Sequence, residues 1–197
     1  MLFSLPEKNL TASVEPGDNR PALAQVDMTI TDAFGKLEAG KEYPFCSGAL
    51  WSTHDLIAWC LRQIGPASLT ACTWSMAEHA ATKLIALLEA GSLTSVAMLV
   101  DWRVQVRTPA AMPLARLHFS DIRVTTCHAK VWILRNEQWS ISVVGSANFT
   151  NNPRIEAGHL STLPAIASFH EEWIKAEIAN SKPFGVDMRK ARQDGRK

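Results

Sequence analysis

The chain has 197 residues, of which 47% are apolar and 20% are charged, a composition typical of a globular domain with one substantial core. Its formal net charge of +1 provides no overall field that would attract nucleic acid or a membrane surface, so any basic binding surface has to be local. The apolar stretches fall short of the ~20 residues that a membrane-spanning helix needs, and we expect no membrane insertion.

Residues 1–50 are interrupted by proline and glycine, which predicts loops with short strands, among them one over residues 24–30. We treat this segment as an N-terminal extension. The start, MLFSLPEKNL, lacks the basic segment and the apolar run of a secretory signal. The four cysteines form neither a CxxC pair nor a Cys/His zinc spacing. These observations predict a cytoplasmic protein with reduced thiols.

Residues 51–182 alternate between helical and strand patterns. Ser52, with Asp55 in the first turn, predicts the start of a helix that ends at Gly65, and capping boxes predict further helices from Ser75 and Ser168. The strand patterns cover residues 68–74, 95–104, 122–134, 139–144 and 156–162, and residues 108–118 predict a loop or a short helix. The order predicts an α/β (α+β) domain with a mixed central sheet flanked by helices.

Residues 183–197 form a basic C-terminal tail, in which MRKARQDGRK carries five basic residues against one acid. Such a tail is typical of a solvated, frayed terminus. The alternative is a basic arm that rests on phosphates.

Polar side chains interrupt two neighbouring strand patterns. In CHAKVWIL, His128 and Lys130 stand two residues apart, and residues i and i+2 of a strand share a face. If the strands over 122–134 and 139–144 form a hairpin, Ser146 and Asn148 return beside this pair. Glu156 begins the next strand and can reach the same place. The preceding Cys127 is expected to face the core.

These side chains suit an anionic phosphodiester. Lys130 offers a positive charge, Asn148 offers amide donors and Ser146 a hydroxyl for the phosphate oxygens, and Arg154 is either a further phosphate contact or a surface residue. His128 can attack phosphorus or carry a proton near neutral pH, and Glu156 can fix its tautomer.

No carboxylate cluster is present for a metal, so we expect neither a metal nor a cofactor. Each residue also has a structural interpretation when taken singly: a core histidine, a lysine at a sheet edge, a simple turn.

The segments HAK at 128–130 and GSAN at 145–148 resemble the HKD signature of the phospholipase D superfamily, and Glu156 lies where that family has its downstream acid. The resemblance spans roughly residues 65–180. It implies a phospholipase D-like sheet and metal-independent phosphodiester chemistry through a phosphohistidine on His128. The single motif is similar to that of the short bacterial endonucleases, which implies a homodimer acting on nucleic acid, DNA ahead of RNA.

The sequence departs from the family in two ways: Arg135 stands where the signature has an aspartate, and the gap to Gly145 is longer. Two alternatives therefore stay open. One is a phosphate- or nucleic-acid-binding module without turnover. The other is a phospholipase or phosphatidyl transferase, which would need an amphipathic surface helix that the sequence does not clearly provide.

Overall fold

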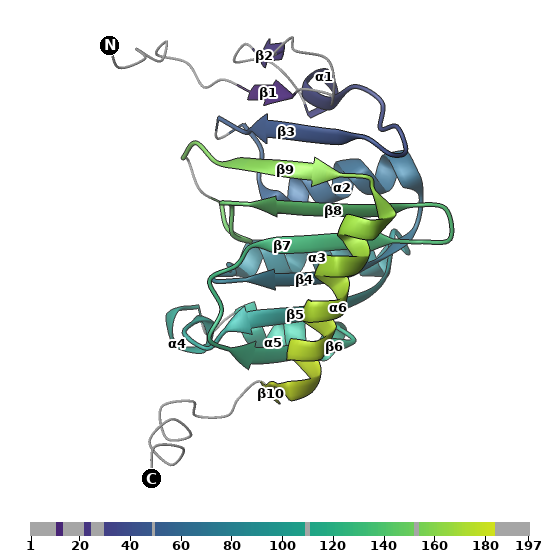
Figure 1. Cartoon of the computed structure of the whole chain (residues 1–197). Coiled ribbons are helices and arrows are strands. Elements are labelled where there is room, and N and C mark those ends of the chain that lie inside the picture. Colours follow the sequence, from purple (N-terminus) through teal and green to yellow (C-terminus); the bar gives the residue numbers. More distant parts are fainter. Residues whose placement is uncertain are drawn as a thin grey trace.

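The computed structural model describes residues 11–13, 22–24, 30–48, 50–108, 111–151 and 154–183. These form one mixed sheet in the strand order β10-β6-β5-β4-β7-β8-β9-β3-β1-β2, with helices on both faces (Figure 1). The predicted class, a mixed central sheet flanked by helices, is confirmed. The strands are β1 (Thr11–Ser13), β2 (Ala22–Ala24), β3 (Glu42–Cys46), β4 (Ala67–Thr73), β5 (Leu93–Asp101), β6 (Asp121–Thr125), β7 (Val131–Arg135), β8 (Ser140–Gly145), β9 (Ala157–Ser161) and β10 (Lys182–Pro183).

The helices divide unequally between the two faces of the sheet. They are α1 (Ile30–Phe34), α2 (Thr53–Ile64), α3 (Glu78–Glu89), α4 (Val104–Arg107), α5 (Ala111–His118) and α6 (Pro164–Asn180). Helix α6 crosses the front face in Figure 1, while α2, α3 and α5 lie behind the sheet. The larger apolar cluster includes residues of α2, α3 and α5, and the smaller one lies under α6. Because the central strands are covered on both sides, they contain continuous apolar runs, as in VWIL of β7.

The predicted helix at Ser52 is confirmed, but the other two predicted helix starts are wrong. Ser52 and Asp55 form a capping box at the start of α2. Helix α3 instead begins after Ala77, because the backbone of Ser75 is bound to the segment around Asn148. Helix α6 begins four residues before Ser168, where Pro164 supplies a φ angle suited to a first helical turn.

The single strand predicted over residues 122–134 is two strands, β6 and β7, which lie on either side of the β5–β4 pair. Between them the backbone leaves the sheet, because the N–H of Cys127 is bound by the carboxylate of Asp101. His128 and Lys130 therefore lie in a crossing connection and not on a strand face. The hairpin of β7 and β8 is confirmed, with Val131 opposite Val144.

Part of the segment expected to be an N-terminal extension belongs to this sheet. Strand β3 pairs with β9 along its whole length, and Phe34 and Tyr43 lie in the larger core cluster. Of the strand predicted over 24–30, Ala24 ends β2 and Ile30 begins α1, and the residues between lie outside the described part of the chain. The basic tail also lies outside it beyond Pro183.

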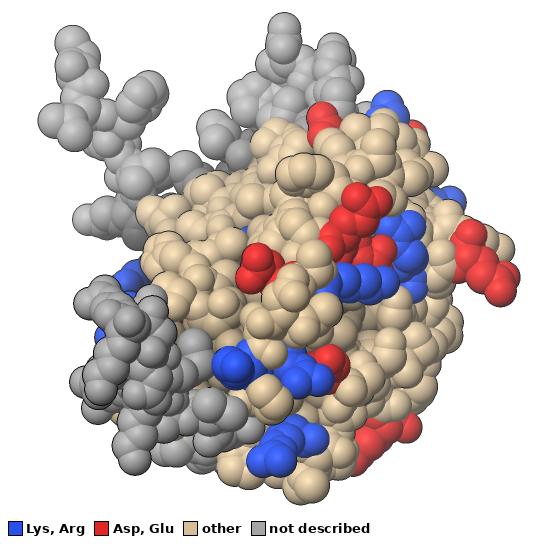
Figure 2. Space-filling model, turned by 60° about the horizontal axis from the view of Figure 1, so that its bottom comes forward, with Lys and Arg blue, Asp and Glu red and all other residues tan. Residues whose placement is uncertain are grey.

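The described helices include none with the length and apolar character required to cross a membrane. Figure 2 turns the β6–β10 edge of the sheet forward and shows both basic and acidic side chains on a largely uncharged face. Among the described residues of this face, basic and acidic side chains are interspersed and form no continuous basic surface. Attraction for an anion has to come from particular side chains.

Candidate active site at the carboxyl edge of the sheet

Strands β4, β5, β6 and β8 run in the same direction, so their carboxyl ends meet at one edge of the sheet. The connection from β6 to β7, which carries His128 and Lys130, crosses this edge. The turn after β8, which carries Ser146 and Asn148, leaves from it. The topology therefore gathers the four predicted polar residues at the edge where open α/β sheets commonly bind ligands.

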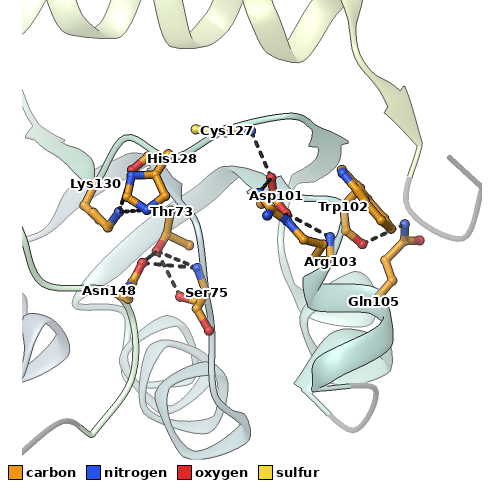
Figure 3. A network of polar contacts seen from close by, with 10 residues as sticks. All are labelled: Thr73, Ser75, Asp101, Trp102, Arg103, Gln105, Cys127, His128, Lys130 and Asn148. Atoms are coloured by element: carbon orange, nitrogen blue, oxygen red, sulfur yellow. Dashed lines mark hydrogen bonds and ion pairs between the residues drawn. The ribbon is translucent and has the colours of Figure 1, made fainter. Parts of the chain in front are cut away.

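His128 and Lys130 contact each other directly (Figure 3). The Lys130 Nζ lies 3.2 Å from Nδ1 and 3.4 Å from Nε2 of His128, and it donates to the His128 carbonyl oxygen at 2.5 Å. An ammonium group only donates, so the tautomer of the imidazole decides which of the two ring nitrogens can accept from it. The imidazole is exposed and Lys130 is half-buried, so a ligand from solvent can reach both.

Partial burial lowers the pKa of Lys130, and this effect outweighs the opposing attraction of nearby Cys127 and Glu156. The lysine is thus partly desolvated, which strengthens its attraction for an anionic oxygen. Cys127 itself is buried against Val131 and Ile133, as expected for a core residue.

Asn148 is held in place by hydrogen bonds that its side-chain and backbone oxygen atoms accept. Its Oδ1 accepts from the Thr73 hydroxyl and from the Ser75 N–H, both at 3.2 Å, and its backbone oxygen accepts from the Thr53 hydroxyl at 3.0 Å. The side-chain NH₂ is therefore the part of Asn148 that is left to donate to a ligand. The roles of Thr73 and Ser75 carry no local sequence signal, because each lies more than 70 residues from Asn148.

Ser146 and Glu156 form a second fixed pair. The Ser146 hydroxyl donates to the Glu156 carboxylate and accepts from the Ala157 N–H at 3.0 Å. The strands approach so closely here that a Cβ at Gly145 would lie 3.0 Å from the Ala157 carbonyl oxygen, which explains the glycine. The described contacts of His128 are with Lys130 and Trp74, so the orientation of its imidazole by Glu156 stays a prediction.

The Trp74 indole lies beside the imidazole of His128, with ring centroids 5.5 Å apart and planes inclined at 56°. Trp74 follows directly after β4, on the same edge, and the Lys130 Nζ lies 5.9 Å from its ring centroid. The indole thus forms one wall of the site.

Asp101 is a residue of the candidate site that the sequence analysis missed. It ends β5, it is fully buried, and its carboxylate accepts the Cys127 N–H at 3.1 Å and the Arg103 Nε and Nη2 at 2.6 and 3.0 Å (Figure 3). Burial by itself would raise the pKa of Asp101, but these bonds outweigh it and the pKa lies below its ordinary value. Asp101 therefore stays ionised and holds the backbone directly before His128.

A cavity of about 290 Å³ adjoins the site on the side of α2, lined by residues that include Trp51, Thr53, Asn148 and Glu156. Arg154 is exposed, and no contact within the described part of the chain joins it to His128 or Lys130. The described residues also contain no group of three or more His, Cys, Asp or Glu side chains placed to hold a metal ion.

No protein-family model and no curated protein matches the chain. Among solved structures, NucT from Helicobacter pylori is similar over 66% of this chain and 91% of its own, with a TM-score of 0.52 and 12% identity. Nuc from Salmonella typhimurium, a phospholipase D family member, covers the same shares with a TM-score of 0.48 and 18% identity. Polyphosphate kinase from Porphyromonas gingivalis matches 74% of this chain and 27% of its own, with a TM-score of 0.48 and 15% identity. The likeness to NucT shows a common fold.

Proposed function

We propose that this chain, whose fold is that of the phospholipase D superfamily, is a metal-independent phosphodiesterase that cleaves nucleic acid. Of the two nucleic acids, we expect DNA rather than RNA to be the substrate. One observation carries the proposal: the Lys130 Nζ lies 3.2 Å from a ring nitrogen of the exposed His128, at the edge where Asn148 is also fixed. An imidazole nucleophile beside a cation and an amide donor suits attack on an anionic phosphate.

Each side chain has a role in the proposed reaction that follows from its chemistry. Lys130 and the Asn148 amide bind the nonbridging oxygens, where negative charge builds up during attack. Ser146 lies next to them and is held by Glu156. We assign Ser146 and Arg154 to substrate binding, and Glu156 to orienting the imidazole, directly or through Ser146.

We infer a two-step reaction in a homodimer, since each chain supplies one His128. A ring nitrogen of His128 attacks phosphorus, and the bond to the leaving oxygen breaks as that oxygen takes a proton from His128 of the partner subunit. This second imidazole then removes a proton from water, whose oxygen attacks phosphorus. The P–N bond breaks and frees a phosphomonoester.

Arg135, which replaces the aspartate of the family signature, lies away from the proposed active site and so gives no reason to prefer an inactive binding module over an enzyme. It lies at the carboxyl end of β7, whereas His128 and Lys130 lie before the amino end. Its guanidinium is bound to Glu171, Ser140 and Ser168. The replacement thus leaves the edge that carries His128 unobstructed.

The test is cleavage of plasmid and of a single-stranded oligonucleotide in EDTA, with His128→Ala against His118→Ala, an exposed histidine on α5, as the matched control. We expect the wild type and the control to cleave, and His128→Ala to bind without cleaving. Binding without cleavage by the wild type would favour the module. Hydrolysis of phosphatidylcholine vesicles without cleavage of nucleic acid would favour the phospholipase.

A further inference from the structure

We propose that Arg103 and Arg107, gathered on the Trp74 indole, form a subsite for the phosphate next to the scissile one. This inference rests on the proposed function and deepens it, because it specifies that the substrate is a polymer with successive phosphates. A subsite of this kind would favour an oligonucleotide over an ester with a single phosphate.

The cations around Trp74 are unusually concentrated. The Arg107 guanidinium carbon lies 4.9 Å from the ring centroid, that of Arg103 lies 5.5 Å away, and the Lys130 Nζ lies 5.9 Å away. The imidazole of His128 lies 5.5 Å from the same indole. A single ring thus joins the attacking group and its lysine to two guanidinium groups that come from the end of β5 and from α4.

The two arginines keep donors for a ligand. Asp101 takes the Nε and Nη2 of Arg103, which leaves Nη1 outside the hydrogen bonds of the described residues. Arg107 is exposed, and its guanidinium has no carboxylate partner within the described part of the chain. A guanidinium that lies against an aromatic face keeps its N–H edge available, and this edge matches the geometry of a phosphate.

The side chains around the Trp74 indole carry an excess of positive charge, which can bind an anion. Arg103 is balanced by Asp101 and Lys130 is attracted by the nearby Glu156 carboxylate, whereas the exposed Arg107 has no carboxylate partner among the described residues. Lys130 faces His128 and is assigned to the scissile phosphate. Arg107, with the remaining edge of Arg103, is then free for a second phosphate.

The polar atom of the Trp74 indole is left without a partner among the described residues. The Nε1–H of Trp74 is buried and has no acceptor among the described residues, although buried donors in native proteins are nearly always bonded. The protein thus retains a tryptophan at a position that does not satisfy its polar atom. What the indole does provide is an aromatic face for the three cations beside His128.

The experiment compares Arg107→Ala with Arg62→Ala, an exposed arginine in the last turn of α2 at the opposite edge of the sheet. The affinity for a fluorescent oligothymidylate is measured by anisotropy over a range of salt concentrations. Hydrolysis of the same oligothymidylate and of bis(p-nitrophenyl) phosphate, which has one phosphate, is measured in parallel.

We expect Arg107→Ala to weaken oligothymidylate binding about tenfold and to lower the slope of log K against log salt by about one, with Arg62→Ala unchanged. Hydrolysis of bis(p-nitrophenyl) phosphate is expected to stay at the wild-type level, and Arg107→Lys to recover part of the affinity.

An unchanged affinity and salt slope in Arg107→Ala would overturn the subsite, as would equal losses on both hydrolysis substrates, which would place Arg107 at the scissile phosphate. If the wild type hydrolyses neither substrate, the proposed function fails. The anisotropy measurement still decides the subsite in that case, because it does not require turnover.

Discussion

Asp101 shows how a single buried carboxylate sets the position of the site. It accepts the N–H of Cys127, the residue before His128, and it fixes the guanidinium of Arg103. We predict that Asp101→Asn lowers kcat for nucleic acid by about 10- to 100-fold, because loss of the charge-assisted bonds allows the backbone before His128 to shift. The measurement is kcat with KM on the same oligonucleotide, beside a thermal melt.

Asp121→Asn is the matched control for this change. Asp121 also pairs with the arginine two residues on, Arg123, at 2.7 Å, but it begins β6 at the opposite edge and is partly exposed. We expect its kcat to stay within twofold of the wild type, as is usual for a surface ion pair. A kcat of Asp101→Asn as high as that of the control would remove Asp101 from the positioning of His128.

At the scale of elements, Arg135 docks β7 onto α6. It binds Glu171 at 2.7 Å as well as Ser168 of the same helix, and its side chain is 30% exposed against 11% for Glu171. Installing the aspartate of the family signature, Arg135→Asp, places two carboxylates together. We predict a loss of about 2 kcal/mol in the free energy of unfolding, below the 3–5 kcal/mol of a fully buried pair.

Urea denaturation of three variants checks this prediction. Lys175→Ala removes the more exposed partner of Glu171 and is expected to cost less than about 1 kcal/mol. The double variant Arg135→Asp/Glu171→Arg reverses the pair and is expected to recover part of the loss. If Arg135→Asp is as stable as the wild type, Arg135 does not hold β7 against α6.

The contact between α2 and α3 makes the stability of the fold depend on pH. The His54 and His79 rings lie 5.2 Å apart, and burial lowers the pKa of His54. The Asp55 carboxylate opposes this shift, whereas His79 and Lys83 add to it. Below the unfolded-state pKa of about 6.5, the unfolded chain binds a proton that the folded chain rejects.

Stability from a neutral His54 is therefore complete above pH 6.5 and declines as the pH falls toward the lowered pKa, by at most about 1.4 kcal/mol per pH unit. We predict a lower denaturation midpoint at pH 5.5 than at pH 7.5 in the wild type, and a smaller difference in His54→Asn. His118→Asn, at an exposed position, is the control and should keep the wild-type difference. An undiminished difference in His54→Asn would assign it to other groups.

Local patterns predicted the elements that depend on local chemistry, such as α2 with its Ser52 cap and the hairpin of β7 and β8. The predictions failed where side chains distant in the sequence determine where an element begins or ends. The segment 122–134 contains no Gly, Pro, Asn or Asp that would predict a turn, yet the chain leaves the sheet at Cys127, whose N–H is taken by Asp101, 26 residues away. Ser168 and Glu171 have the spacing of a capping box, but both bind Arg135 from within α6.

The residues of the candidate site likewise divide into those that local sequence features predict and those that they do not. The approach of Ser146 and Asn148 to the edge that carries His128 and Lys130 could be predicted from the hairpin of β7 and β8, a local property, whereas the shared strand face expected for His128 and Lys130 is wrong because they lie in the connection before β7. The supporting groups Thr73, Ser75 and Asp101 could not, because their roles arise only when the carboxyl ends of separate strands meet. Asp101 carried one usable signal, an acid at the end of an apolar strand.

At the scale of the whole molecule, the proposed reaction needs two imidazoles, whereas one chain brings a single His128 to the edge of its sheet. In a two-fold dimer each chain presents the same surface, so two copies of one histidine can share one site. A dimer that contains one His128→Ala subunit should then be inactive. Under the proposed mechanism, activity belongs to the pair of subunits and depends on subunit composition, unlike the activity of separate sites.

We predict that coexpressed, differently tagged wild-type and His128→Ala subunits form heterodimers without activity, and that an equal random mixture retains roughly a quarter of the wild-type activity per chain. Independent sites would retain about half. An equal mixture of wild type with Arg62→Ala should keep full activity, since Arg62 lies at the opposite edge of the sheet. Light scattering of each preparation establishes the mass, and an active species with the mass of one chain would show that a single His128 suffices.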